Sequence, residues 1–153
     1  MLSPSHLSLF LAIALMLHVT EEFYFPGGFI EWYRELVPPK TTGIRFGYLV
    51  FINTAVMFIA ALGLFYGDSP SGASIFLGLS TAMAVNALFH VYGVIRLRKY
   101  SPGVVTGVIL LLPLYAVGLI TVVGGGVLPV WLPFVFLVFA AAYHAKSIIR
   151  QSK

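Results

Sequence analysis

Five apolar stretches, each about as long as a membrane helix, make up most of this chain. A helix that crosses the hydrocarbon core of a bilayer needs about 20 mostly apolar residues. Short joints rich in Pro, Gly and Ser separate the stretches. The sequence therefore predicts an all-α fold: an integral membrane bundle of five transmembrane helices in a single membrane domain over residues 1–153. The expected spans are 6–24, 43–66, 72–95, 103–123 and 128–146.

The composition supports a membrane protein and excludes several kinds of site. Hydrophobic residues account for 59% of the chain and charged residues for 9%, which does not suit the surface of a soluble domain. The chain has no cysteine, so disulfides, thiolate ligands and a cysteine nucleophile are excluded. The net charge of +4 is explained by membrane topology, and we expect no nucleic-acid partner.

The nine Lys and Arg residues predict the orientation. With five spans, all nine lie on one side, in the loops 25–42 and 96–102, at the boundary residue Arg45 and in the C-terminal tail. The positive-inside rule then places the N-terminus outside and the C-terminus in the cytoplasm. The basic run at 96–99 would also attract anionic membrane lipids. The first span has no basic residues ahead of it and no cleavage-site pattern, so we expect a permanent helix.

Several patterns predict local structure. Pro113 should kink the fourth span, because proline removes an internal hydrogen bond. Ser101 and Pro102 have the order of a helix N-cap followed by a first-turn proline. Residues 28–37 can form a short helix at the membrane interface. Three glycine pairs have the spacing that lets helices approach closely. The same spacing could bring helices of two copies together, so a homo-oligomer is also possible. These pairs are Gly43 and Gly47, Gly63 and Gly67, and Gly103 and Gly107.

Ionisable side chains inside the first span are the main functional signal. His18, Glu21 and Glu22 interrupt an apolar segment, and each such group costs roughly 2.5 to 3.5 kcal/mol to insert. At 100° per residue, Glu21 lies about 60° to one side of His18 and Glu22 about 40° to the other. The three side chains therefore share one helix face, and a functional site is expected there.

Polar residues of the other spans fall at similar depth. Asn86 and His90 are four residues apart on the third span, Asn53 lies in the second, and His144 lies near the inner end of the fifth. A rise of about 1.5 Å per residue places all of them in the cytoplasmic half of the bilayer. We expect one polar cavity facing the cytoplasm, in which Asn53 and Asn86 bind substrate.

Structural roles compete with this interpretation. The two glutamates could end a helix at the interface and reach water or pair with arginine. His90 with Asn86 could form a hydrogen bond between helices, and Asn53 could do the same. His144 could be an interface residue beside Tyr143.

The ordered motifs resemble one known family. His18, Glu21 and Glu22 form an HxxEE pattern, His90 is a further histidine, and residues 100–103 read YSPG. In this order the motifs resemble the HXXEE-domain family of small integral membrane proteins, over nearly the whole chain. The resemblance implies site roles for these residues and for Tyr100, and it implies no particular reaction.

The function that the sequence favours is a membrane-embedded enzyme for a lipid or isoprenoid-like substrate, with its site in the cytoplasmic half of the bilayer. In one version a divalent metal, Zn, Fe or Mn, is held by imidazole and carboxylate, with open positions for water or substrate. A remaining glutamate would be the general base. The candidate ligands are His18, Glu21, Glu22, His90 and His144.

Two alternatives stay open. Without a cofactor, one of two adjacent carboxylates in a low dielectric stays protonated and could protonate a double bond, while His18 or His90 takes a proton elsewhere. Such an enzyme would be an isomerase or cyclase, with aromatic faces stabilising a carbocation. A non-enzymatic protein could instead bind a small ligand or relay protons, or serve as an assembly subunit.

Overall fold

The computed structural model describes residues 2–38 and 44–151, and every element in these ranges is helical. The helices before the fourth long rod are α1 (Pro4–Phe23), α2 (Phe29–Leu36), α3 (Phe46–Tyr66) and α4 (Pro70–Leu97). The fourth rod is continuous but irregular, and comprises α5 (Val104–Thr106), η1 (Gly107–Leu111), α6 (Leu112–Gly118) and η2 (Leu119–Gly124), where η denotes a π-helix. The last helix is α7 (Leu132–Gln151).

Five of these rods are long and apolar enough to cross a membrane, which confirms the predicted all-helical, five-span architecture. The largest difference in bounds is at the fifth, which begins at Leu132 and not at 128. Residues before it form a turn, since Gly126 has a φ of +74° and Pro129 follows. The other bounds differ by smaller amounts. The five rods are Pro4–Phe23, Phe46–Tyr66, Pro70–Leu97, Val104–Gly124 and Leu132–Ile149.

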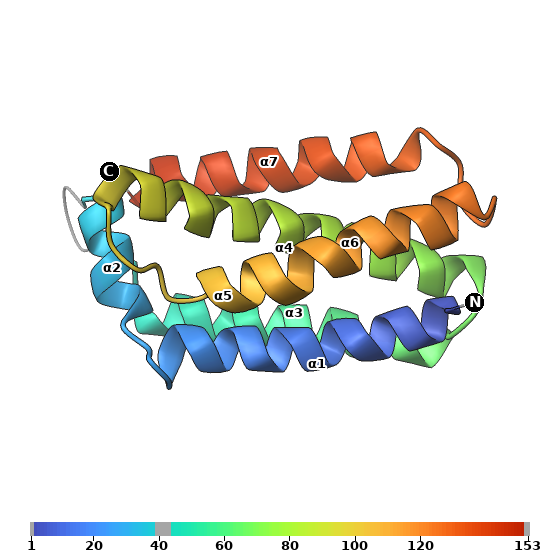
Figure 1. The fold of residues 1–153 in the computed structure, drawn as a ribbon, viewed down its shortest axis with the longest axis horizontal. Helices are drawn as coiled ribbons and strands as arrows, with labels where there is room; N and C mark the ends of the chain where they lie inside the picture. Colours follow the sequence, from blue (N-terminus) through green and yellow to red (C-terminus); the bar gives the residue numbers. More distant parts are fainter. Residues whose placement is uncertain (1, 39–43, 152–153) are drawn as a thin grey trace.

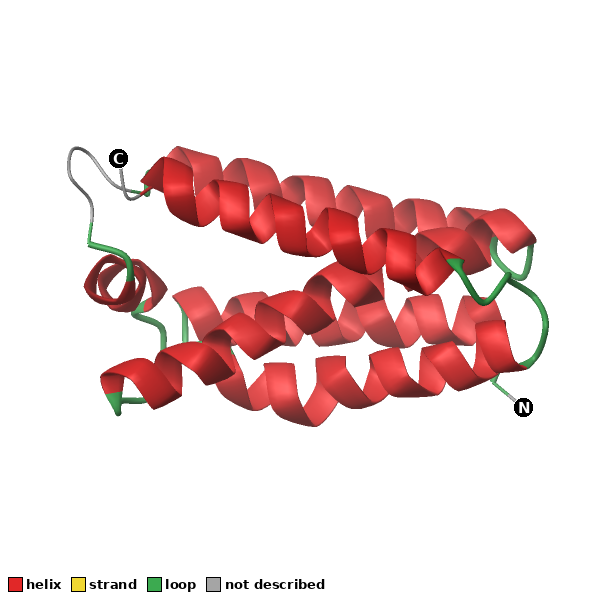
Figure 2. Cartoon of the chain, turned by 90° about the horizontal axis from the view of Figure 1, so that it is seen from above, coloured by secondary structure: helices red, strands yellow, loops and turns green. Residues whose placement is uncertain are grey.

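Helix α4 is the centre of the bundle. It packs against α1, α3, α6 and α7, and the views in Figures 1 and 2 show the long helices side by side with α2 lying across one end. Half of the apolar part of α4 is buried, against 6% of that of α7. The main core contains Leu7, Leu11 and Leu15 of α1 with Phe76 and Leu77 of α4. The peripheral α7 therefore covers only one side of α4.

A tight turn sends the chain from α1 across the end of the bundle. Gly27 and Gly28 have φ values of +72° and +89°, a conformation that favours glycine. The following helix α2 buries Phe29, Trp32 and Tyr33 against the bundle. The short helix expected within 28–37 is therefore present, as Phe29–Leu36. We call this end of the bundle the α2 end.

Basic residues gather at the α2 end. Arg34 belongs to α2, Arg45 precedes α3, and Lys146 lies in the last turns of α7. Lys99 follows α4 and pairs with Glu35 of α2 at 2.6 Å. The opposite end carries Asp68, which accepts a hydrogen bond from the Ser5 backbone at 2.8 Å. The predicted charge asymmetry is thus a property of the fold, while Lys40 and Lys153 lie outside the described residues.

The structure shows some of the local features expected at proline and at the glycine pairs. Pro113 stands in the first turn of α6, directly after the π-helix η1, so the missing N–H coincides with a widened helical turn. Among the glycines, Gly63 lies close to Ser8 of α1, where an added Cβ would be 3.3 Å from Oγ, and Gly67 ends α3 with a φ of +53°. Gly47 faces open space, and Gly43 lies outside the described residues.

Candidate functional site

Two buried histidines from different helices meet at the α2 end. His18 of α1 and His90 of α4 have ring centroids 5.2 Å apart, with their planes at 84°. Both are buried, with 1% and 0% of their surfaces exposed. Burial of two polar rings requires polar partners, and the structure provides them around both rings.

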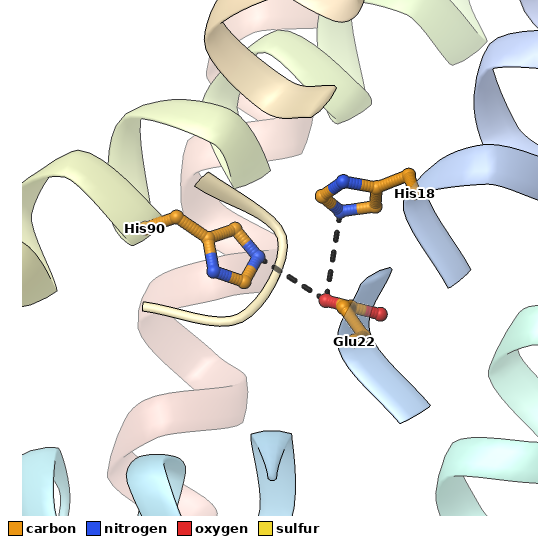
Figure 3. A group of neighbouring side chains, drawn as sticks. All are labelled: His18, Glu22 and His90. Carbon is orange, nitrogen blue, oxygen red and sulfur yellow. Dashed lines mark ion pairs between the residues drawn. The ribbon is translucent and has the colours of Figure 1, made fainter. Parts of the chain in front are cut away.

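Glu22 lies between these two rings. Its Oε1 is 3.1 Å from His90 Nε2 and 3.5 Å from His18 Nε2. Figure 3 shows the Glu22 carboxyl facing both rings. His18 and Glu22 share a face of α1 because they are four residues apart. The ligand atoms of the three side chains lie within 4.8 Å of one another. We call His18, Glu22 and His90 the triad.

Hydroxyl groups hold the far side of each ring. Thr106 Oγ1 lies 2.9 Å from His18 Nδ1, and Ser101 Oγ lies 2.9 Å from His90 Nδ1. The Thr106 hydroxyl donates to Glu21 Oε2, so His18 Nδ1 is assigned as the donor toward Thr106. The Nε2 atom of His18 then carries a free lone pair on the triad side.

The side-chain amide of Asn86 supports the same assignment for both rings. Its Nδ2 lies 3.0 Å from His18 Nε2 and 3.2 Å from His90 Nε2. An amide NH2 has two hydrogens, so it can donate one to each lone pair. Both Nε2 atoms thus face a common point, with the Asn86 amide and the Glu22 carboxyl beside them.

Trp32 of α2 closes the outer side of His90. The two rings are stacked, with centroids 5.3 Å apart and an interplanar angle of 19°. The indole also leaves no room at Gly93, where an added Cβ would be about 3.0 Å or less from two ring atoms. The rotation of His90 is therefore fixed by packing as well as by its hydrogen bond to Ser101.

Glu21 performs a different task from its neighbour Glu22. Its carboxylate accepts hydrogen bonds from the Tyr100 hydroxyl at 2.5 Å, the Val105 and Thr106 backbone N–H groups at 3.0 and 2.7 Å, and the Thr106 hydroxyl at 2.5 Å. It thereby satisfies free N–H groups at the start of the fourth rod. Burial and the bond to Glu21 raise the pKa of Tyr100, which keeps this phenol a donor. Glu21 ties α1 to the segment that covers the triad.

Gly103 brings the backbone directly against both imidazoles. An added Cβ would lie 2.8 Å from His18 Cε1 and 2.9 Å from His90 Cε1, and the residue has a φ of +98°. Gly107, one turn later, similarly meets Ala87 at 3.1 Å. Glycine is therefore required at 103 for two separate reasons, conformation and space.

A cavity of about 130 Å³ adjoins the triad. Glu22 and Asn86 form part of its wall, with Asn53 of α3 and His144 of α7. Most of the remaining lining is apolar or aromatic, including Leu15, Val19, Ile52, Val56 and Met83. Polar residues of four spans therefore line this cavity, whereas His18, Glu21 and His90 do not.

Comparison with known proteins places this arrangement in a family. Residues 9–118 match the family described as "Protein of unknown function with HXXEE motif". The chain belongs to the HXXEE family. It is also similar to "Uncharacterized protein YrkK" of Bacillus subtilis (strain 168), with 29% identity over 106 residues, which cover 68% of this chain and 66% of that relative. No solved structure matches the chain.

The geometry explains the HxxEE motif residue by residue. The histidine and the second glutamate, His18 and Glu22, point to the triad, whereas the first glutamate, Glu21, holds the start of the fourth rod. The YxPG motif covers the same site, because Tyr100 donates to Glu21 and Ser101 contacts His90. Each motif residue named here therefore has a structural partner in the other motif or in the triad.

The remaining candidates lie apart from the triad. Asn53 donates to the Leu49 carbonyl of its own helix at 2.9 Å while lining the cavity. His144 packs against Phe89 and Tyr143, with centroid distances of 6.4 and 5.6 Å. Within the described residues, the cluster of possible metal ligands contains neither Glu21 nor His144. Three of the five side chains predicted as ligands therefore lie together, while Glu21 and His144 contact other residues.

Four residues around the triad had no assigned site role in the sequence. Ser101 was expected to cap a helix, but α5 begins at Val104 with Gly103 at its N-cap position, and Ser101 contacts His90. Gly103 was expected only to allow helix packing. In the sequence, Thr106 is only a hydroxyl-bearing residue in an apolar span. Trp32 is only an aromatic residue at the membrane interface. Only the YxPG motif could have indicated a site role for Ser101 and Gly103.

Proposed function

We propose that this protein is a membrane-embedded, metal-dependent enzyme that acts on a lipid or isoprenoid-like substrate. The observation that carries the proposal is the triad: three buried ligand atoms within 4.8 Å of one another. Two imidazoles and one carboxylate suit Zn, Fe or Mn, and three protein ligands leave positions for water or substrate. The hydroxyls at both Nδ1 atoms are the outer partners that metal-bound histidines use.

The chemistry proposed for the site is activation of water or polarisation of a substrate oxygen by the metal. Glu22 and the Nε2 atoms of the two imidazoles would hold the ion. The Asn86 amide, which lies beside both Nε2 atoms, would then be free to orient the group bound next to the ion. The segment at Gly103 and the stack with Trp32 exclude bulk water from one side of the site. Glu21, occupied by four hydrogen bonds, would position the covering segment.

The proposed orientation follows from charge. Arg34, Arg45, Lys99 and Lys146 lie at the α2 end, so this end would face the cytoplasm under the positive-inside rule. The triad would then lie in the cytoplasmic half of the bilayer. The apolar lining of the adjoining cavity supports a substrate with a hydrocarbon body.

Elemental analysis of the purified protein tests the metal directly. The protein would be prepared in detergent without chelators and under anaerobic conditions, beside His18→Ala, His90→Ala and Glu22→Gln. We expect about one metal ion per chain in the wild type and loss in all three variants. His144→Ala and His6→Ala are matched controls that should retain the ion. A wild type without metal, or undiminished metal in His90→Ala, would contradict the proposal.

A second candidate is a metal-free acid–base enzyme, an isomerase or cyclase. It is favoured by the direct contact of Glu22 Oε1 with His90 Nε2 at 3.1 Å, a hydrogen-bond distance that allows proton transfer without an ion. Incubation with isoprenoid alkenes in D2O distinguishes the two. Deuterium incorporation that survives chelation and is lost in Glu22→Gln supports the metal-free enzyme. Binding without turnover in either assay supports a non-enzymatic ligand-binding protein.

A further inference from the structure

The cavity beside the triad has a neighbouring cavity farther along the bundle, between α3 and α7. A second cavity, of about 470 Å³, is lined by Ile59 of α3, by α4, and by Phe136 and Phe139 of α7. Ala82 and Tyr143 line both cavities, so the two lie next to each other at these residues, and we call them together the groove. Because α7 covers only one side of α4, the groove has α4 as its floor and the other two helices as walls.

Small side chains on α4 give the groove its depth. Ser74, Gly78, Ala82 and Asn86 follow one another at intervals of four residues and therefore lie on one face of the helix. An added Cβ at Gly78 would touch the Phe136 ring at 3.4 Å, so the opposite wall is close. From Ser74 to Asn86 the helix rises about 18 Å, which is more than half of the ~30 Å hydrocarbon core.

The lining changes from polar to apolar along this length. Glu22, Asn86 and Asn53 lie at the triad end. The far part is lined almost wholly by aliphatic and aromatic side chains, with Ser74 as its polar exception. A ligand that satisfies both parts has a polar head and a slender hydrocarbon chain. Taken together, the two volumes fall in the range of pockets that hold one small ligand, which favours a single chain.

A hydrogen bond spans the groove where the two cavities lie next to each other. The hydroxyls of Tyr48 on α3 and Tyr143 on α7 are 2.7 Å apart, and this bond joins the two walls. Both rings also line the cavity at the triad end. The tyrosine pair thus holds α3 and α7 at a fixed separation above α4.

We propose that this groove binds the single hydrocarbon chain of an amphiphile, such as a fatty acyl or prenyl compound, with its polar head at the triad. The chemistry at the head rests on the proposed function, whereas binding of the chain does not require a metal. The tyrosine pair closes the groove over the hydrocarbon chain. Ala82, which lines both cavities, sets the width of the groove where the hydrocarbon passes from one cavity to the other.

Photocrosslinking with a long-chain fatty acid that carries a diazirine near its methyl end tests the proposal. The intact protein in nanodiscs would be labelled, and the modified residues mapped by mass spectrometry. We expect labelling of Ile59, Ile75 and Phe136. Ala82→Leu should reduce this labelling about tenfold by filling the groove, whereas the matched variant Ala142→Leu, on the exposed face of α7, should not.

The wild-type map decides the proposal even if Ala82→Leu does not fold. Labelling spread evenly over lipid-facing residues such as Ile109 and Ile120 would overturn it. Crosslinks that form only between two copies of the chain would make the groove a subunit contact and would overturn it equally. Wild-type protein from which a chelator has removed the metal should retain groove labelling. Loss of metal with intact labelling is therefore distinguishable from failure of the groove itself.

Discussion

The imidazole of His90 lies 5.2 Å from that of His18, ring centre to ring centre, although the two rings belong to helices that are far apart in the chain. This proximity is the geometric condition for any chemistry that uses both histidines. It depends on close packing of α1 and α4 and on the segment after α4, which returns to cover the rings. The covering segment, the carboxylates, the hydroxyls that contact the imidazoles and the tyrosine pair can each be tested by substitution.

Gly103→Ala should destabilise the protein and abolish metal binding. The positive φ costs roughly 1 kcal/mol for a non-glycine residue, and the clash of Cβ with both imidazoles adds about 1 to 3 kcal/mol. Gly126→Ala is the matched control, because Gly126 has a φ of +74° but no atom within 4 Å of an added Cβ. Thermal unfolding in detergent and elemental analysis measure both effects. Equal losses in the two variants would contradict the role of the backbone contact.

Glu21→Gln should affect stability, whereas Glu22→Gln should affect metal binding. The first removes a carboxylate that accepts four hydrogen bonds and should lower the free energy of unfolding by about 2 kcal/mol while the ligands remain. The second removes a ligand and should lose the metal. Unfolding free energy and metal content are measured for both. Metal loss in Glu21→Gln with an intact fold would show that the two carboxylates share the site.

Thr106→Val and Ser101→Ala should weaken metal binding by about 10- to 100-fold, because each removes the hydroxyl that orients one imidazole. Competition with a metal-sensitive dye gives the affinity. Thr81→Val is the control for loss of a buried hydroxyl, since Thr81 donates to the Leu77 carbonyl of its own helix. An unchanged affinity in the first two variants would mean that packing alone orients the rings.

A double-mutant cycle measures the bond between Tyr48 and Tyr143. Tyr48→Phe, Tyr143→Phe and the double variant should give a coupling free energy of about 1 kcal/mol. Replacing Tyr92, which is exposed on α4, by Phe should have little effect. Unfolding by denaturant in a fixed detergent is the measurement. Additive effects of the two tyrosine substitutions would show that the hydroxyls do not hold α3 to α7.

The periodicity of the sequence predicted the five rods because hydrophobic length and Pro/Gly joints are local properties of the chain. Local geometry also placed His18 and Glu22 on one face of α1, since residues four apart are neighbours on any helix. Their shared depth with Asn86 and His90 followed from counting residues along the spans. These inferences needed no knowledge of how the helices are rotated against one another.

The separation of Glu21 from Glu22 was decided only by the tertiary structure. Adjacent residues differ by about 100° around a helix, so one can face α4 while the other faces the start of α5, and only packing determines which. For the same reason the sequence could not show that His144 packs beside Phe89, outside the triad. Ser101, Gly103 and Thr106 reach the imidazoles because the chain folds back after α4. Contacts of this kind join distant segments, and no local pattern encodes them.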